Sequence, residues 1–393
     1  MRDVSIIGVG VHPFGRHLTK SILDLGRVAV LAAIADAGVD PRSIGCAYVG
    51  NSLAGLLTGQ EGIRGQVILH DSGIYDIPVI NVENACASGS TAVRGAYLEV
   101  AAGTCDVALA LGVEKMFVGD TKRTLAALAA DSELTLSSSG MQFSAMYAIH
   151  PKYNLRGRMD EYGWTREDFA AVAVKNHRHG SLNPSAHRRR ELTLEQVLAA
   201  PVVAEPLTAP MCSPISDGAA AAIVCATEVL PDAARPGAVT IRACELRSGH
   251  FFTSDDRDYK PLANFSSHVF ETAGLGPHDL EVAEVHDAMA PVELLIYEQL
   301  GLCGPGEGPR LVAGGETLLG GARPVNPSGG LTARGHPVGA TGLAQIAEIV
   351  WQLRGQAGAR QVDPQPRVGL AHNQGGMLAS GDSAAYMMTV LTR

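Results

Sequence analysis

The sequence predicts an α/β protein built from two similar halves. The first observation is a repeat, because AGVDPRSIGCAYVGN, which begins at Ala37, resembles AGLGPHDLEVAEVHD, which begins 236 residues later at Ala273. The second is that each copy has a helical run ending at Ala-Gly, a Pro turn and an apolar stretch, which is the pattern of a helix, a loop and a buried strand. The third is that further pairs of similar segments follow in the same order. Together these features indicate a duplicated unit with buried, mostly apolar strands.

Three further pairs extend the repeat along both halves. CASGSTAVRGAYLEV and GATGLAQIAEIVWQL each open with small and hydroxyl residues and continue as a long helical pattern. VALALGVEKM and VGLAHNQGGM are apolar, as buried strands are, and SDGAAAAIV matches GDSAAYMMT. The six segments begin at Cys86, Gly339, Val107, Val368, Ser216 and Gly381.

The first half carries an insert that has no counterpart in the second. We therefore expect an N-terminal half over residues 1–116, completed by residues 215–232, an inserted domain over 117–214 and a C-terminal half over 237–393. Part of the insert is helical, since TREDFAAVAVKNH begins at Thr165 with the Thr-x-x-Asp pattern of a capping box. A long insert over one face of an α/β core is usually functional, so it is predicted to be a lid or substrate loop. A dimerisation or packing element is the alternative.

Composition and charge exclude several classes of protein. The chain has 393 residues, 46% of them hydrophobic and 18% charged, which suits a large globular protein of two or three domains. The net charge of -9 argues against attraction to nucleic acid or to an anionic membrane. No signal peptide and no apolar run of ~20 residues is present, and a cytoplasmic location is expected. The seven cysteines are widely spaced without a CxxC pair, so reduced thiols are expected and no metal site is.

Polar residues follow or precede several of the apolar segments, where α/β sheets place their ligands. In the second half these are His286 with Asp287, His336 in a Gly-rich stretch, and His372 with Asn373. Each also has a structural interpretation, because His286 and His372 can be satisfied core histidines and His336 a turn residue in solvent. We expect the histidines to face one shared cleft.

Cys86 is the candidate nucleophile of the first half. A free cysteine is most often a small core residue. Its position at the predicted start of a helix favours the thiolate, because the backbone N–H groups and the helix dipole stabilise negative charge, and this predicts a lowered pKa. A nearby imidazole can take the thiol proton, as in other Cys–His pairs. The other six cysteines are assigned no role.

Phosphate-binding motifs are absent. There is no GxxxxGK[ST], and no GxGxxG follows a strand and opens a helix. Arg188, Arg189 and Arg190 offer positive charge within the insert and could meet the phosphates of a ligand. A solvated charge run is the preferred interpretation of these three arginines.

These motifs resemble those of the thiolases. NACASGS, from Asn84, is similar to the thiolase nucleophile loop, and NPSGGLTARGHPVGATG is very similar to the Gly-His-Pro loop. The resemblance runs almost from end to end. It implies the duplicated thiolase fold, with two βαβαβαββ halves in α/β/α/β/α layers and an inserted loop domain. The His-Asp pair at 286 and 287 and the final loop from His372 to Gly376 are most similar to the sterol-carrier-protein-type thiolases.

The resemblance also implies an activity and roles for particular residues. Cys86 would be acylated by a coenzyme A thioester, which is a substrate and not a permanently bound cofactor, and His336 would activate it. His336 and a water held by His286 would bind one thioester oxyanion. The backbone N–H groups of Cys86 and of Gly375 or Gly376 would bind the other. Two transfers through one acyl-enzyme imply ping-pong kinetics.

The sequence departs from the family at the second cysteine, which serves other members as acid and base for the carbon nucleophile. The two positions where that cysteine occurs hold Ala288 and the HNQ of the final loop. We nominate His372 for this proton transfer, because imidazole titrates near neutrality. The alternatives are a retro-aldolase or acyltransferase that works with an OB-fold partner, an inactive scaffold subunit, and a cysteine hydrolase. By resemblance we also expect an acyl-CoA substrate and a homodimer or homotetramer.

Overall fold

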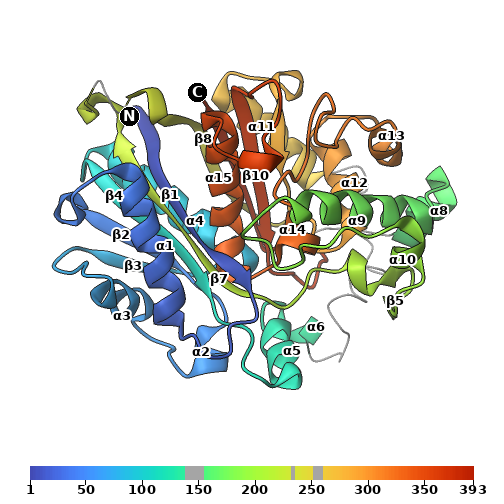
Figure 1. The fold of residues 1–393 in the computed structure, drawn as a ribbon, viewed down its shortest axis with the longest axis horizontal. Helices are drawn as coiled ribbons and strands as arrows, with labels where there is room; N and C mark the ends of the chain where they lie inside the picture. The colour runs from blue at the N-terminus through green and yellow to red at the C-terminus, as the bar shows by residue number, and fades with distance from the viewer. Residues whose placement is uncertain (138–154, 232–234, 251–259) are drawn as a thin grey trace.

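The computed structural model describes residues 1–137, 155–231, 235–250 and 260–393 (Figure 1). Its centre is one nine-stranded sheet in the order β3-β2-β4-β7-β1-β8-β11-β10-β9. The strands are β1 (Val4–Gly15), β2 (Cys46–Gly50), β3 (Val79–Val82), β4 (Val107–Glu114), β7 (Asp217–Ala226), β8 (Val239–Ser248), β9 (Val282–Glu284), β10 (Val368–Gly375) and β11 (Ala385–Thr392).

The two halves repeat the same strand pattern, which confirms the predicted duplication. In the first half β2 runs parallel to β4, and β4, β7 and β1 are antiparallel neighbours. In the second half β9 runs parallel to β10, and β10, β11 and β8 are antiparallel neighbours. A short antiparallel contact between β1 and β8, which includes Ser5 opposite Thr240, joins the halves into one sheet. The place next to β9 that corresponds to β3 holds an isolated bridge from Ala283 to Val325.

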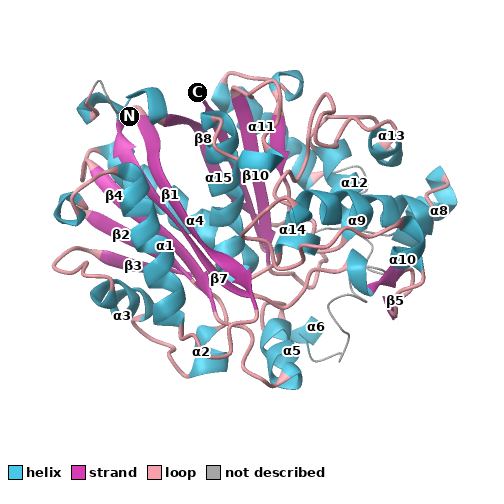
Figure 2. Ribbon diagram, in the orientation of Figure 1, coloured by secondary structure: helices cyan, strands magenta, loops and turns pink. Residues whose placement is uncertain are grey.

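Helices arrange the two halves in layers (Figure 2). The helices α4 (Ser88–Ala102) and α15 (Val338–Arg354) pack against each other, and α15 contacts strands of both halves. The outer face of the first half is covered by α1 (Ile22–Ala37) and α3 (Arg64–Asp71), and that of the second by α11 (Pro261–Ala273) and α12 (Ala290–Gln299). The expected α/β/α/β/α order is therefore present. The shorter helices are α2 (Ala54–Thr58), α13 (Gly308–Ala313) and α14 (Gly330–Arg334).

The described part of the insert packs mainly on the second half. It comprises α5 (Thr121–Ala129), α6 (Leu134–Ser137), α8 (Leu155–Tyr162), α9 (Arg166–Ser181), α10 (Leu194–Leu198), β5 (Val202–Ala204) and β6 (Leu207–Thr208). Residues 138–154 of the predicted insert, residue 232 at the predicted end of the first half and residues 251–259 of the predicted second half lie outside the described residues. The predicted capping box is present, because Thr165 Oγ1 accepts from the N–H of Asp168 and Asp168 accepts from the N–H of Thr165.

The helix α9 of the insert packs into the hydrophobic core of the second half. Phe169 and Val172 are fully buried in one cluster with Val285 and Leu294. This burial stabilises the insert as a packed element. Among the described helices, none is both long and apolar enough to span a membrane.

Candidate active site

Cys86 lies at the sharp turn that leads from β3 into α4. Ala85 has φ 49°, a left-handed conformation that costs a non-glycine residue free energy and is often found at functional turns. The hydroxyl of Ser88 fixes the turn, because it accepts from the N–H of Asn84 at 2.9 Å and donates to the carbonyl of Ala85 at 2.7 Å. The thiol is thus held at the N-terminal end of α4, in the helical layer between the two halves, with 5% of the residue exposed.

His336 reaches this thiol from the second half. Its Nε2 lies 3.2 Å from the Sγ of Cys86, although the residues are 250 positions apart. The approach depends on glycines where α4 meets α15, because a Cβ on Gly89 would lie 2.6 Å from the carbonyl oxygen of Gly339. Small residues at these two helix starts, noted in the sequence repeat, therefore let Cys86 and His336 meet.

A hydroxyl determines which nitrogen of His336 carries the proton. Thr341 Oγ1 donates its single hydrogen to the carbonyl of Pro337 at 2.9 Å and lies 2.7 Å from the Nδ1 of His336. The hydroxyl must therefore accept at that contact, so the neutral ring is protonated at Nδ1. The bare Nε2 is left facing Cys86 as an acceptor for the thiol proton.

The pKa values of the pair oppose the thiolate expected from the helix dipole. Burial raises the pKa of the Cys86 thiol well above its usual value, and the charges of Asp131 and Glu114 raise it further. Burial lowers the pKa of His336 to about 3, with a smaller contribution from Arg334. The prediction of a lowered thiol pKa is therefore wrong, because removal from water outweighs the favourable helix terminus. The resting pair is a neutral thiol beside a neutral imidazole.

The ring of His286 contacts the ring of His336. The two rings are in edge contact with their centroids 5.2 Å apart, and a nitrogen of His286 lies within 4.8 Å of the Cys86 sulfur. The amide of Asn373 donates to the Nδ1 of His286 at 3.2 Å, so a neutral His286 carries its proton on Nε2. His286 is thereby fixed as a donor, although it does not itself line the cleft.

His372 occupies a different position from the one predicted. It lies in β10, fully buried, and its Nδ1 accepts from the backbone N–H of His286 at 3.4 Å. It is not among the residues that line the cleft. The expectation that all three histidines face one cleft is therefore wrong, and the position of His372 indicates support of the His286 backbone instead of proton transfer to a substrate.

The two glycines of the final loop pack against the nucleophile turn. A Cβ on Gly375 would lie 2.1 Å from the carbonyl oxygen of Asn84 and 3.0 Å from the nitrogen of Cys86. Gly376 has φ 66°, which favours glycine. This close approach brings the backbone of the final loop beside the N–H of Cys86, where two donors can face one oxyanion.

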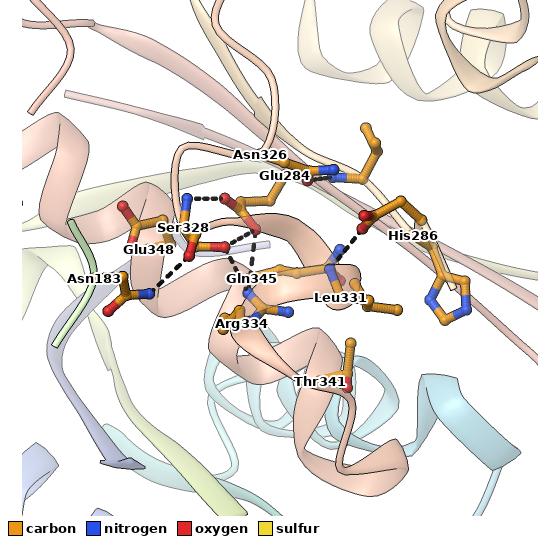
Figure 3. Close-up of polar contacts among 12 residues, drawn as sticks. Asn183, Glu284, His286, Asn326, Ser328, Leu331, Arg334, Thr341, Gln345 and Glu348 are labelled. Carbon is orange, nitrogen blue, oxygen red and sulfur yellow. Dashed lines mark hydrogen bonds and ion pairs between the residues drawn. The ribbon is translucent and has the colours of Figure 1, made fainter. Parts of the chain in front are cut away.

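The long Gly-rich loop that carries His336 is anchored by buried carboxylates (Figure 3). Glu284 accepts from Ser328 Oγ at 2.7 Å and from Arg334 at 3.1 Å. Asp287 accepts from the N–H of Leu331 at 2.7 Å and from Asn176 of the insert at 2.9 Å. These contacts show that Asp287 positions the loop and the insert.

A cleft of about 410 Å³ opens beside the thiol. Of the six predicted site residues, Cys86 and His336 line it. Three further charged or thiol side chains that the sequence did not indicate line it as well, namely Arg16, Asp131 and Cys212, together with Arg188. The interpretation of Arg188 as part of a solvated charge run is wrong, because its guanidinium is largely buried and donates to the carbonyls of Cys212 and Thr332.

One group of described residues also has the donor atoms of a metal site. The nitrogen and sulfur atoms of Cys86, His286 and His336 lie within 4.8 Å of one another, and such ligands suit Zn²⁺. In the described structure Nε2 of His336 is already engaged with the thiol. This arrangement also suits a nucleophile and its base.

Comparison with known proteins agrees with this geometry. Residues 4–228 match the thiolase N-terminal domain, and residues 246–387 match the thiolase C-terminal domain-like family. The acetyl-CoA acetyltransferase of Methanothermobacter thermautotrophicus is 42% identical over 99% of this chain and 100% of its own. The benzoylsuccinyl-CoA thiolase subunit BbsB of Thauera aromatica is 38% identical over 95% of each chain. Human sterol carrier protein 2 is 37% identical over 95% of this chain and 70% of its own.

Solved structures share the fold. The Ltp2-ChsH2(DUF35) aldolase aligns with a TM-score of 0.79 and 24% identity over 99% of this chain and 97% of its own. Human mitochondrial 3-ketoacyl-CoA thiolase aligns with a TM-score of 0.73 and 17% identity over 100% of this chain and 98% of its own. The chain belongs to the thiolase family. Within that family it is an enzyme of the thiolase-type acyltransferase class.

Proposed function

We propose that the protein forms an acyl-enzyme at Cys86 and makes or breaks a carbon–carbon bond in a 3-oxoacyl-CoA. The observation that carries the proposal is the 3.2 Å contact between the Cys86 sulfur and a His336 nitrogen that is free to accept a proton. The relative from Methanothermobacter is named an acetyl-CoA acetyltransferase, which is consistent with this reaction.

The first half-reaction follows from the two neutral partners. Cys86 attacks the thioester carbonyl as its S–H proton moves to Nε2 of His336, so the buried sulfur need not carry a full charge before attack. The N–H of Cys86 and that of Gly375 or Gly376 bind the developing oxyanion, and each such donor is typically worth ~3–4 kcal/mol. His336 then returns the proton to the departing CoA sulfur. His286 serves the other oxyanion with its Nε2 proton, through a bound water.

The cleft also supports a site for the coenzyme A portion of the substrate. Arg16 and Arg188 both line it, and the guanidinium of Arg188 is paired in the described residues with carbonyl oxygens and no carboxylate. A buried cation that lacks an anionic partner attracts the phosphates of an incoming thioester. Apolar lining from Phe117, Leu125 and Met289 suits the pantetheine and acyl chains.

The experiment uses acetyl-CoA and a longer acyl-CoA with the purified protein. Intact-mass and peptide mass spectrometry should find one acyl group on Cys86 that added CoA removes, and Cys86→Ala should carry none. CoA-dependent loss of acetoacetyl-CoA or of a longer 3-oxoacyl-CoA should follow. Absence of the adduct with every thioester would overturn the proposal, and steady release of free acid without CoA would indicate a cysteine hydrolase.

A second candidate is a retro-aldolase or an acyltransferase that requires an OB-fold partner subunit. It is favoured by Ala288 and the HNQ of the final loop, where the family has its second thiol, and by the relative BbsB, which is named a subunit. Acylation of Cys86 without any thiolysis by the isolated protein would support this candidate. Full thiolysis by the homo-oligomer alone would exclude it, and the intact Cys86–His336 contact argues against an inactive scaffold.

We also propose that the chain is a cytoplasmic homodimer or a dimer of dimers. The strand β3 is the edge of the sheet, and its residues are only partly buried, so one row of its backbone groups is open to pairing. All seven cysteines are free, as in a reducing compartment. Sedimentation should give at least twice the 41.0 kDa of the chain.

A further inference from the structure

The carbon–carbon step needs a group that the acyl-transfer pair does not provide. If the proposed function holds, a second thioester must lose a proton from the carbon next to its carbonyl before that carbon attacks the acyl group on Cys86. His336 regains a bare Nε2 once its proton has passed to the departing CoA, but this nitrogen lies 3.2 Å from the Cys86 sulfur that carries the acyl group. The proton of the second thioester therefore calls for another acid and base, and position 288 is alanine.

Asp131 has the contacts that such a group requires. Its carboxyl lines the same cleft as Cys86 and His336. One oxygen, Oδ1, accepts from the hydroxyl of Ser52 at 2.7 Å. The other, Oδ2, is buried and has no hydrogen-bond partner among the described residues. A buried carboxyl oxygen without a donor is costly in a folded protein unless it serves a ligand or a reaction.

The backbone of this segment is clamped to the final loop. The carbonyl of Asp131 accepts from the N–H of Met377 at 3.2 Å, and the N–H of Glu133 donates to the carbonyl of Met377 at 2.8 Å. A Cβ on Gly376 would lie 3.2 Å from that same carbonyl of Asp131. Asp131 is therefore held against the loop that flanks the nucleophile, although it comes from the insert.

The electrostatics of the segment also suit proton transfer. Burial raises the pKa of Asp131 to about 8; the Ser52 hydrogen bond lowers it, and the nearby Glu114 and Glu83 raise it. Asp131 is in turn the charge that raises the pKa of Cys86 most. A group that titrates near neutrality can both take and return a proton.

The other cleft thiol is less suited to this role. Burial raises the pKa of Cys212 to about 12, despite the opposing influence of Arg188. Such a thiol holds its proton too tightly to act as a base near pH 7. Asp131 is the better candidate because of its pKa and because its Oδ2 has no hydrogen-bond partner among the described residues.

We propose that Asp131 is the catalytic acid and base of the carbon–carbon step. In condensation Oδ2 takes the α-proton of the second thioester, and the resulting carbanion forms a bond to the acyl carbon. The bond from that carbon to the Cys86 sulfur breaks, and the sulfur recovers the proton from Asp131, directly or through His336. Thiolysis runs the same steps in reverse, so the protons and electrons balance without an oxidant or reductant.

The test separates the two half-reactions. Asp131→Asn keeps the size of the side chain and removes the base, so acylation of Cys86 by acetyl-CoA should stay within about threefold of wild type. Condensation and thiolysis should fall by at least ~100-fold, in the range that general acid–base catalysis contributes. In a Cys86→Ala background, exchange of deuterium from solvent into the acetyl-CoA methyl group should depend on Asp131.

Controls make the outcomes distinct. Asp71→Asn, at an exposed aspartate that does not line the cleft, should alter neither reaction, and Asp131→Glu should recover part of the carbon–carbon step. Thiolysis that survives Asp131→Asn would overturn the inference, as would an equal loss of acylation, which would assign Asp131 to the structure of the turn. If Cys212→Ala lost condensation and thiolysis but kept acylation, the acid–base role would belong to that thiol. Lack of any acyl adduct in the wild-type protein would instead defeat the proposed function.

Discussion

The hydroxyl of Thr341 holds His336 in the tautomer that can accept a proton from Cys86. Because Thr341 donates to the carbonyl of Pro337, it can only accept from Nδ1 of the ring. This contact lies within one turn at the start of α15, whereas the thiol comes from the other half of the chain. A local hydrogen bond thus prepares the long-range pair.

Replacement of Thr341 by valine should slow acylation. The shape is kept, but the N–H at Nδ1 loses its acceptor, and an unsatisfied buried donor costs ~1–3 kcal/mol. Part of the population should shift to the other tautomer, which presents a proton to the thiol. We expect a ~10- to 100-fold slower appearance of the acyl adduct by rapid-quench mass spectrometry. Thr341→Ser should stay within about threefold, and an unchanged rate in Thr341→Val would contradict the tautomer argument.

The rate of acylation should lack the usual titration of histidine. Burial lowers the pKa of His336 to about 3, so the neutral ring that accepts the proton persists above that pH and is lost only below it. A histidine with the ordinary pKa of ~6.5 would lose about tenfold between pH 7.5 and 5.5. We expect less than a twofold change in the single-turnover rate over that range, checked in buffers of constant ionic strength. An inflection near pH 6.5 that remains in Asp131→Asn, whose side chain does not titrate, would show that the ring is charged in the resting site.

Gly375→Ala should damage the nucleophile turn. The new Cβ would lie 2.1 Å from the carbonyl of Asn84 and 2.7 Å from the nitrogen of Ala87, both of which are backbone atoms. The turn must move, at a cost of ~1–3 kcal/mol of unfolding free energy. A lower melting temperature and a changed rate of Cys86 alkylation by iodoacetamide should report it. Gly62→Ala is the matched control, because its Cβ would meet nothing within 4 Å.

Asn373→Asp should lower kcat more than a substitution of His372 does, because it changes the protonated nitrogen of His286. A carboxylate accepts where the amide donated, so Nδ1 of His286 would become the protonated nitrogen and Nε2 would lose its proton. The water proposed to bind the oxyanion then lacks its donor, and we expect kcat to fall ~10- to 100-fold. Steady-state thiolysis kinetics would measure this. His372→Gln should lower kcat less than about tenfold. A larger loss of kcat in His372→Gln than in Asn373→Asp would instead support His372 as the proton-transfer residue.

The sequence predicted the parts of the fold that repeat locally. The matched segments from Ala37 and Ala273 end in β2 and β9, and those from Cys86 and Gly339 form α4 and α15. Such predictions succeed because cap residues and apolar periodicity act within one element. Asp131 gave no signal, since it follows an ordinary alanine-rich helix and has no spacing relation to Cys86. Arg188 was predicted to be solvent-exposed, because three adjacent arginines usually lie on the surface, but it is largely buried.

The amino-acid sequence alone therefore determined the family and the two halves, and it predicted Cys86 and His336 as the nucleophile and its base. The tertiary structure decided which side chains share the cleft and which protonation states they hold there. His372 lies outside the cleft lining, whereas Asp131 and Arg188 belong to it. Burial raises the pKa of Cys86, where the sequence predicted a lowered value. The physical reason is that the contacts and burial that set these properties come from residues far apart along the chain, and only packing brings them together.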